Sequence, residues 1–127
     1  MPVPVTLLYG GLTALLVTFL GMNVSRMRGS LKAGPRDMPA ELVRPSRAHG
    51  NAAEWSALGI LLLLVLELSQ AAGSAVLHFF GGVFFLGRVF HAYGLYTKTR
   101  LHVAGAAITY LVMLVMSVWA ISFHFAR

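Results

Sequence analysis

Three polar side chains with complementary chemistry stand at helical spacing just before a long apolar run: Arg47, Asn51 and Glu54. They lie four and three residues apart, so in an α-helix they share one face within about two turns. The residues that follow, from Trp55 to Leu66, include no charged side chain. Because ionisable groups in a membrane helix are costly and usually face a bundle interior, we interpret this face as a binding site.

The composition of the chain indicates lipid rather than water as its solvent. Of its 127 residues, 57% are hydrophobic and only 11% are charged, whereas a soluble domain carries about 25% charged residues. A bilayer core about 30 Å thick takes about 20 apolar residues per helix, so the chain is long enough for four spans. We predict an all-α integral membrane protein, a single four-helix bundle domain over residues 1–127. Its expected spans cover residues 3–25, 47–69, 75–96 and 101–125.

Basic residues gather in two of the predicted connections. Segment 26–46 together with Arg47 holds six Lys and Arg residues, and segment 97–100 holds two, whereas the opposite side holds only Arg127. Cytoplasmic connections of membrane proteins carry an excess of Lys and Arg. We therefore expect segments 26–46 and 97–100 to be cytoplasmic and both termini to lie on the opposite side of the membrane.

Several function classes are disfavoured by the residues present. The net charge of +6 is spread over connections and forms no basic run interleaved with aromatic residues, so no nucleic-acid partner is expected. The sequence contains no cysteine, so any thiol chemistry must come from a ligand. The five histidines show no HExxH or comparable spacing, and no metal site is expected.

The polar face at the start of the second span suits an anionic or zwitterionic ligand. Ser46 is a good helix N-cap, so Arg47 would occupy the first helical position, and a helix N-terminus that carries arginines binds anions. Arg26 and Arg100 are expected at the same membrane face. Ligand carboxylates would meet these arginines and a ligand ammonium would meet Glu54. Alternatively, the arginines serve only membrane topology and contacts with lipid headgroups.

A buried cation is predicted in the third span, where Arg88 interrupts the apolar sequence. Counting from the outer turn places Arg88 and Glu54 about 20 and 24 Å deep, so the two could neutralise one another and hold the helices together. The other interpretation is that Arg88 contacts the ligand, together with His91, which follows one turn later. Tyr93 and Tyr96 come next, near the membrane interface, where tyrosine is common.

The polar motifs together resemble the MAPEG family, the membrane-associated proteins in eicosanoid and glutathione metabolism. The compact connections are similar to those of short bacterial members, and the resemblance covers essentially the whole chain. It implies a homotrimer of four-helix bundles in a bacterial inner membrane, with glutathione bound between subunits near the cytoplasmic face. The matching motifs are Arg47-Ala-His-x-Asn51-x-x-Glu54, Arg88-x-x-His91, Arg26-x-Arg28 and Arg100.

The same resemblance implies roles for individual side chains. Arg100 resembles the catalytic arginine that lowers the thiol pKa of glutathione and holds the thiolate, since a nearby cation favours the charged form. Leu95 stands where several eukaryotic members have a site tyrosine, and Gly50 stands where prostaglandin E synthases tend to carry an arginine. Tyr93 or Tyr96 would then substitute for the missing tyrosine. The implied glutathione-binding set is Arg26, Arg47, Asn51, Glu54, Arg88, His91, Tyr93 and Tyr96.

Our leading functional hypothesis is a glutathione-dependent membrane enzyme. It would transfer glutathione to lipophilic electrophiles or reduce lipid hydroperoxides, and the lipophilic substrate would enter from the bilayer. The alternative is a non-catalytic protein of the same fold that binds lipid or a small ligand. A small four-span exporter is a third option, but such proteins usually carry an essential carboxylate in the first span, and residues 3–25 contain no Asp or Glu.

Overall fold

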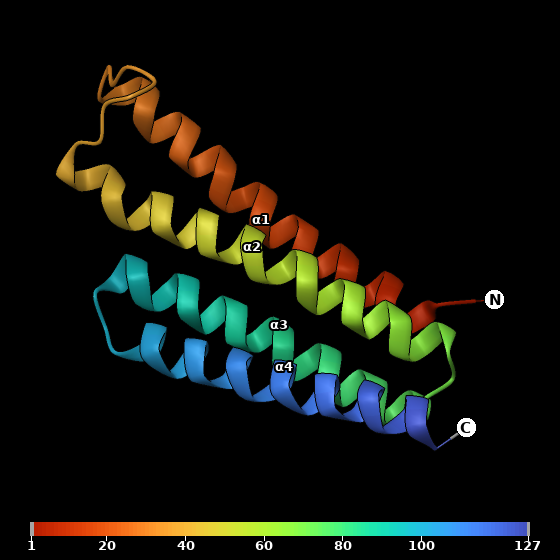
Figure 1. The fold of residues 1–127 in the computed structure, drawn as a ribbon. Coiled ribbons are helices and arrows are strands. Elements are labelled where there is room, and N and C mark those ends of the chain that lie inside the picture. The colour runs from red at the N-terminus through yellow and green to blue at the C-terminus, as the bar shows by residue number, and fades with distance from the viewer. Residues whose placement is uncertain (1, 127) are drawn as a thin grey trace.

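The computed structural model describes residues 2–126 and arranges them as four long α-helices (Figure 1). Each helix is long and apolar enough to cross a membrane, and no β-strand occurs among the described residues. The prediction of an all-α four-helix membrane bundle is therefore confirmed. The helices are α1 (Pro4–Ser30), α2 (Ala40–Leu68), α3 (Ser74–Thr97) and α4 (Leu101–Phe125).

The helices pack in chain order. α1 lies against α2, α2 against α3 and α3 against α4, with further contacts between α1 and α3 and between α2 and α4. Figure 1 shows that connections 31–39 and 98–100 lie at one end of the bundle. Turn 69–73 and both ends of the described chain lie at the other end. The two basic connections thus share one end, as the argument from charge requires.

The expected start of the second helix is wrong. We placed Ser46 at the N-cap and Arg47 at the first helical position, but α2 begins at Ala40 and contains Pro45. Proline lacks the N–H that would bond the carbonyl four residues earlier, so Pro45 costs α2 only the hydrogen bond to Glu41 in its first turn. Arg47 therefore lies about two turns inside the helix, so the predicted contribution of a helix N-terminus to anion binding at Arg47 is wrong.

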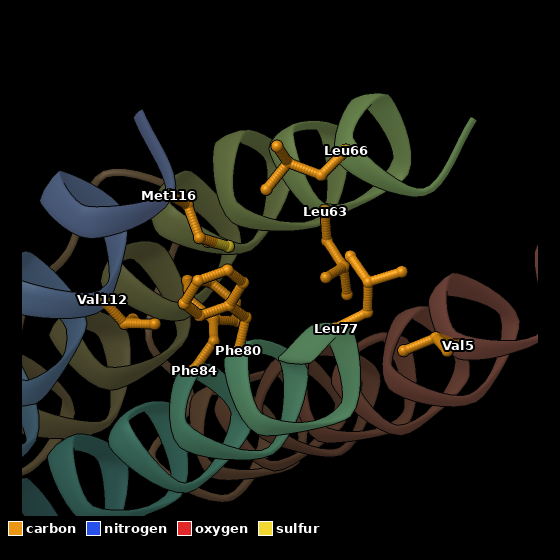
Figure 2. Packing of buried hydrophobic residues seen from close by; sticks show 8 residues of the cluster. All are labelled: Val5, Leu63, Leu66, Leu77, Phe80, Phe84, Val112 and Met116. Atoms are coloured by element: carbon orange, nitrogen blue, oxygen red, sulfur yellow. The ribbon is translucent and has the colours of Figure 1, made fainter. Parts of the chain in front are cut away.

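The main apolar core fills the half of the bundle that lies away from the basic connections. Figure 2 shows its buried side chains converging from all four helices. The ring of Phe84 covers Gly59, where any Cβ would overlap it. A second, smaller cluster occupies the basic half and is rich in alanine, including Ala48, Ala52 and Ala92. These small residues bring α2 and α3 close together beside the polar face. The main cluster comprises Val5, Leu63, Leu66, Leu77, Phe80, Phe84, Val112 and Met116.

Glycines let the backbones of α3 and α4 touch. A Cβ added at Gly105 would meet the backbone nitrogen of His91, and a Cβ added at Gly94 would meet the backbone nitrogen of His102. Close approach through small residues is a common way to pack helices in membranes, where water gives no hydrophobic drive between them. The contact also brings Thr109 of α4 against Arg88 of α3.

Substitution of Gly105 by alanine should destabilise the bundle, because the added methyl group meets backbone that cannot rotate away. Overpacking of this kind costs about 1–3 kcal/mol or more, so the thermal unfolding temperature in detergent should fall clearly. Gly11→Ala is the matched control, because its Cβ would meet nothing within 4 Å. Equal stability of Gly105→Ala and the wild type would contradict the close α3–α4 packing.

Candidate functional site

A groove of about 410 Å³ runs along the first half of α2. All of its lining residues except Met38 belong to α2, so Arg47, Asn51 and Glu54 share one face, as their spacing predicted. A Cβ at Gly50 would meet nothing within 4 Å, so the groove is open beside the three polar side chains. We call it the α2 groove; its lining is Met38, Val43, Ser46, Arg47, Gly50, Asn51 and Glu54.

The charged groups of the α2 groove are free to bind a ligand. Arg47 and Glu54 are exposed, and within residues 2–126 neither forms a hydrogen bond or an ion pair. Glu67, by contrast, accepts hydrogen bonds of 2.9 and 2.7 Å from two backbone N–H groups at the start of α1. It thereby caps that helix, which has no side-chain cap of its own at its N-cap residue. The carboxylate at the far end of α2 is thus structural, whereas Glu54 is available.

Arg88 lies behind the α2 groove, in the interior of the bundle, where only 1% of its surface is exposed. Its Nη1 donates to Asn51 Oδ1 at 2.5 Å, and its Nε and Nη2 donate to Thr109 Oγ1 at 3.0 and 2.6 Å. Glu54 is not among its partners in the described chain, so the ion pair considered from the two depths does not form. Arg88 instead joins α2, α3 and α4 through neutral oxygen atoms.

His91 lies one turn beyond Arg88 and is half-buried. Its Nδ1 lies 2.8 Å from the carbonyl oxygen of His102. A carbonyl can only accept, so Nδ1 carries the proton, and Nε2 of the neutral ring is left as an acceptor. Arg88, one turn away, bonds Asn51 of the polar face. His91 is therefore near the polar face, as expected, although it does not line the α2 groove.

Two other predicted site residues gather in a different place. Arg26 Nη2 donates to Asn23 Oδ1 at 2.8 Å, and Asn23 Nδ2 donates to Tyr96 Oη at 2.7 Å. These three side chains line a cleft of about 760 Å³ between α1, α2 and α3, which we call the basic cleft because Arg44 and Lys98 also line it. Within one chain, the basic cleft and the α2 groove share no lining residue.

Arg100 and Tyr93 line neither of these two cavities. Arg100 occupies the N-cap position of α4 and is exposed, and 57% of the surface of Tyr93 is exposed. One copy of the chain therefore does not bring Arg100 together with Glu54.

Three residues of these polar clusters were missed in the sequence: Asn23, His102 and Thr109. Asn23 links Arg26 to Tyr96, the His102 carbonyl fixes His91, and Thr109 holds Arg88. Thr109 carried a usable signal, because a hydroxyl in the middle of a membrane span needs a partner. Asn23 stands three residues before Arg26, so a shared helix face was also readable. His102 contacts His91 through its backbone carbonyl, so its residue type gave no indication of this role.

Four helices that are long and apolar enough to cross a membrane, with Arg88 buried among them, define a multi-pass α-helical membrane protein. Residues 6–122 match the model of the MAPEG family, and the chain belongs to this family. It is similar to the inner membrane protein YecN of Escherichia coli K12, with 32% identity over 114 residues, 88% of this chain and 86% of YecN. YecN of Escherichia coli O6:H1 matches with the same identity and coverage. The family resemblance inferred from the polar motifs is thus confirmed.

Removal of the Thr109 hydroxyl should destabilise the bundle, because Arg88 loses its hydrogen-bond partner on α4. Thr109→Val keeps the shape but deprives a buried guanidinium of two hydrogen bonds, and bonds to charged groups are worth about 1.5–3 kcal/mol. The thermal unfolding temperature in detergent should fall accordingly. Thr13→Val is the matched control, because Thr13 is equally buried and its hydroxyl has no hydrogen-bond partner in the described chain. If both variants lose the same stability, Arg88 does not depend on Thr109.

Proposed function

We propose that this protein is a glutathione-dependent enzyme of a bacterial inner membrane, a glutathione transferase or peroxidase that acts on lipophilic substrates. The observation that supports it most is the α2 groove, where a free cation, an amide and a free carboxylate follow one another along a helix. Glutathione carries two carboxylates, an ammonium group and a thiol. Arg47 suits a carboxylate and Glu54 suits the ammonium, and charge-assisted hydrogen bonds of this kind are the strong ones.

The proposal includes a second copy of the chain. The α2 groove is lined by one helix and a single connection residue, and small ligands usually bind in more enclosed sites. Arg26 and Arg100 lie elsewhere on the same chain, so a neighbouring copy would supply them. The homotrimer that the family resemblance implies provides such a neighbour.

An exposed stripe along α2 supports this assembly. From Glu54 onward, exposed residues recur at alternating spacings of four and three, the spacing at which helices associate side by side. The first member is charged and belongs to the groove, and the others are apolar. A helix packed on the apolar part would close the groove from outside. The stripe consists of Glu54, Leu58, Leu61, Val65 and Leu68.

The proposed chemistry uses the thiolate of glutathione. Arg100 of a neighbouring copy would stabilise the thiolate, which is the nucleophilic form. The sulfur attacks an electrophilic carbon, forms the new bond, and the leaving group departs with the electrons of its bond. With a hydroperoxide, two molecules of glutathione give the disulfide, an alcohol and water. The lipophilic partner reaches the site from the bilayer, beside the helices.

Charge and similarity support the location and orientation that we propose. The name of YecN supports an inner membrane location, and the basic connections at one end of the bundle favour that end as cytoplasmic. Glutathione would then be drawn from the cytoplasm, and both termini would lie on the opposite side.

The second candidate function is a non-catalytic protein that binds lipid or a small ligand. It is favoured by the position of Arg100, which lies outside the α2 groove of its own chain, and by the absence of a tyrosine at Leu95. It shares the ligand-binding groove with the first candidate but lacks thiolate formation. The two candidates therefore differ in the ionisation of bound glutathione, which only the enzyme requires.

Titration of glutathione into the purified, detergent-solubilised protein tests the proposal through the ultraviolet absorbance of the thiolate. The wild type should give a saturable signal. Glu54→Gln should weaken binding by about tenfold or more, because a charge-assisted bond is lost. Its control is Asp37→Asn, which changes an exposed acid that lines neither the α2 groove nor the basic cleft and keeps an acceptor oxygen for the Gly34 N–H. Binding unaffected by Glu54→Gln would place the ligand elsewhere.

Arg100→Ala should separate the two candidate functions. In the enzyme it abolishes the thiolate absorbance while bound glutathione remains detectable by calorimetry, because the residue acts on the sulfur. Bound glutathione that never ionises, in the wild type as in the variant, would favour the non-catalytic protein. A folded wild type that binds no glutathione would rule out the enzyme and leave the non-catalytic protein that binds lipid or another small ligand.

A further inference from the structure

The hydrogen bonds around Arg88 have a fixed direction. The Thr109 hydroxyl donates to the backbone carbonyl of Gly105 at 2.9 Å, so its oxygen lone pairs are left to accept from Nε and Nη2 of Arg88. A guanidinium has five N–H donors and no acceptor. Whatever faces its remaining N–H groups must therefore be an acceptor.

That requirement determines which way the amide of Asn51 points. Arg88 Nη1 lies 2.5 Å from Asn51 Oδ1, and a flipped amide would set its NH₂ group against a donor. The oxygen of Asn51 is thus held toward the bundle interior, and Nδ2 is turned away from Arg88. Asn51 also lines the α2 groove, and its Nδ2 has no hydrogen-bond partner within residues 2–126. The amide therefore offers only donors to a ligand.

Arg88 is also an unusual way to hold helices together. A buried cation in a membrane bundle normally pairs with a carboxylate or lines a polar pathway, but the described partners of Arg88 are all neutral. Apolar side chains of similar volume commonly stabilise a bundle as well as buried charges do. Fixing the amide direction is something that an apolar residue in its place would not do.

We infer that Arg88 is a positioning residue that makes the centre of the α2 groove selective for a hydrogen-bond acceptor, a carbonyl or carboxylate oxygen of the ligand. The chain of directed bonds runs from the Gly105 carbonyl through Thr109 and Arg88 to Asn51, and its last donors face the groove. Arg88 itself does not touch the ligand. This inference rests on the proposed function, because glutathione is the ligand whose oxygen Asn51 would bind.

The first arm of the test needs no ligand. Asn51→Asp keeps the shape of the side chain and replaces NH₂ with a second oxygen. Beside Arg88 the new carboxylate gains a charged partner, so the unfolding temperature should stay equal or rise. In the Arg88→Met background the same change should lower the unfolding temperature, because the carboxylate has no partner. Equal effects in both backgrounds would show that Arg88 does not fix the amide and would overturn the inference.

The second arm measures glutathione binding by calorimetry. Asn51→Asp removes the donors while the fold is retained, so affinity should fall by about tenfold or more. In the Arg88→Met background the amide is free to flip, so Asn51→Asp should lower the affinity for glutathione clearly less than it does in the wild type. Unchanged binding of glutathione by Asn51→Asp would overturn the selectivity for an acceptor.

A second variant covers the case in which Arg88→Met does not fold. Arg88→Lys keeps a cation and a donor but cannot reach Asn51 and Thr109 together as a planar fork does. The Arg88→Lys variant should remain folded and bind glutathione more weakly than the wild type. In this background, Asn51→Asp should lower the affinity for glutathione less than it does in the wild type. If Asn51→Asp weakens glutathione binding as much in the Arg88→Lys background as in the wild type, the inference is contradicted. If the wild type binds no glutathione while the first arm gives opposite effects, the proposed function fails and the fixed amide stands.

Discussion

A guanidinium buried in a membrane bundle must have its N–H groups satisfied by the protein, and this requirement organises the functional half of the chain. Arg88 meets it with Asn51 on α2 and Thr109 on α4, so three helices are joined at one point. The contact fixes the rotation of α2, and with it the direction in which Arg47 and Glu54 face. The interior charge and the open groove are thus linked through Asn51, which bonds Arg88 and lines the groove.

Close helix packing makes the arrangement possible. Gly87, Gly94 and Gly105 allow α3 and α4 to approach until their backbones touch, and Thr109 then lies within hydrogen-bond distance of Arg88. Alanines between α2 and α3 do the same on the other side. The two halves of the bundle differ in their packing. Large apolar side chains stabilise one end (Figure 2), and small residues leave room for polar groups at the other.

Much of this organisation could be predicted from the sequence. The number of helices follows from apolar length, α3 and α4 begin and end within one residue of the expected spans, and the shared face of Arg47, Asn51 and Glu54 follows from spacing. The start of α2 was missed because Pro45 was interpreted as a helix boundary. The partner of Arg88 was also missed, because counting residues gives depth in the membrane but not rotation about the helix axis. The sequence also did not predict that Arg26 and Tyr96 lie in a cleft separate from the α2 groove, because this separation depends on how the helices pack.

We propose that the α2 groove binds glutathione between copies of the chain. An experimental structure of the protein in lipid with glutathione added tests it most directly. We expect a tripeptide along α2 that contacts Arg47, Asn51 and Glu54, with an acceptor oxygen on the Asn51 amide and an arginine from a neighbouring copy near the sulfur. A groove filled by a lipid chain or by a packed helix, or glutathione bound elsewhere, would contradict it.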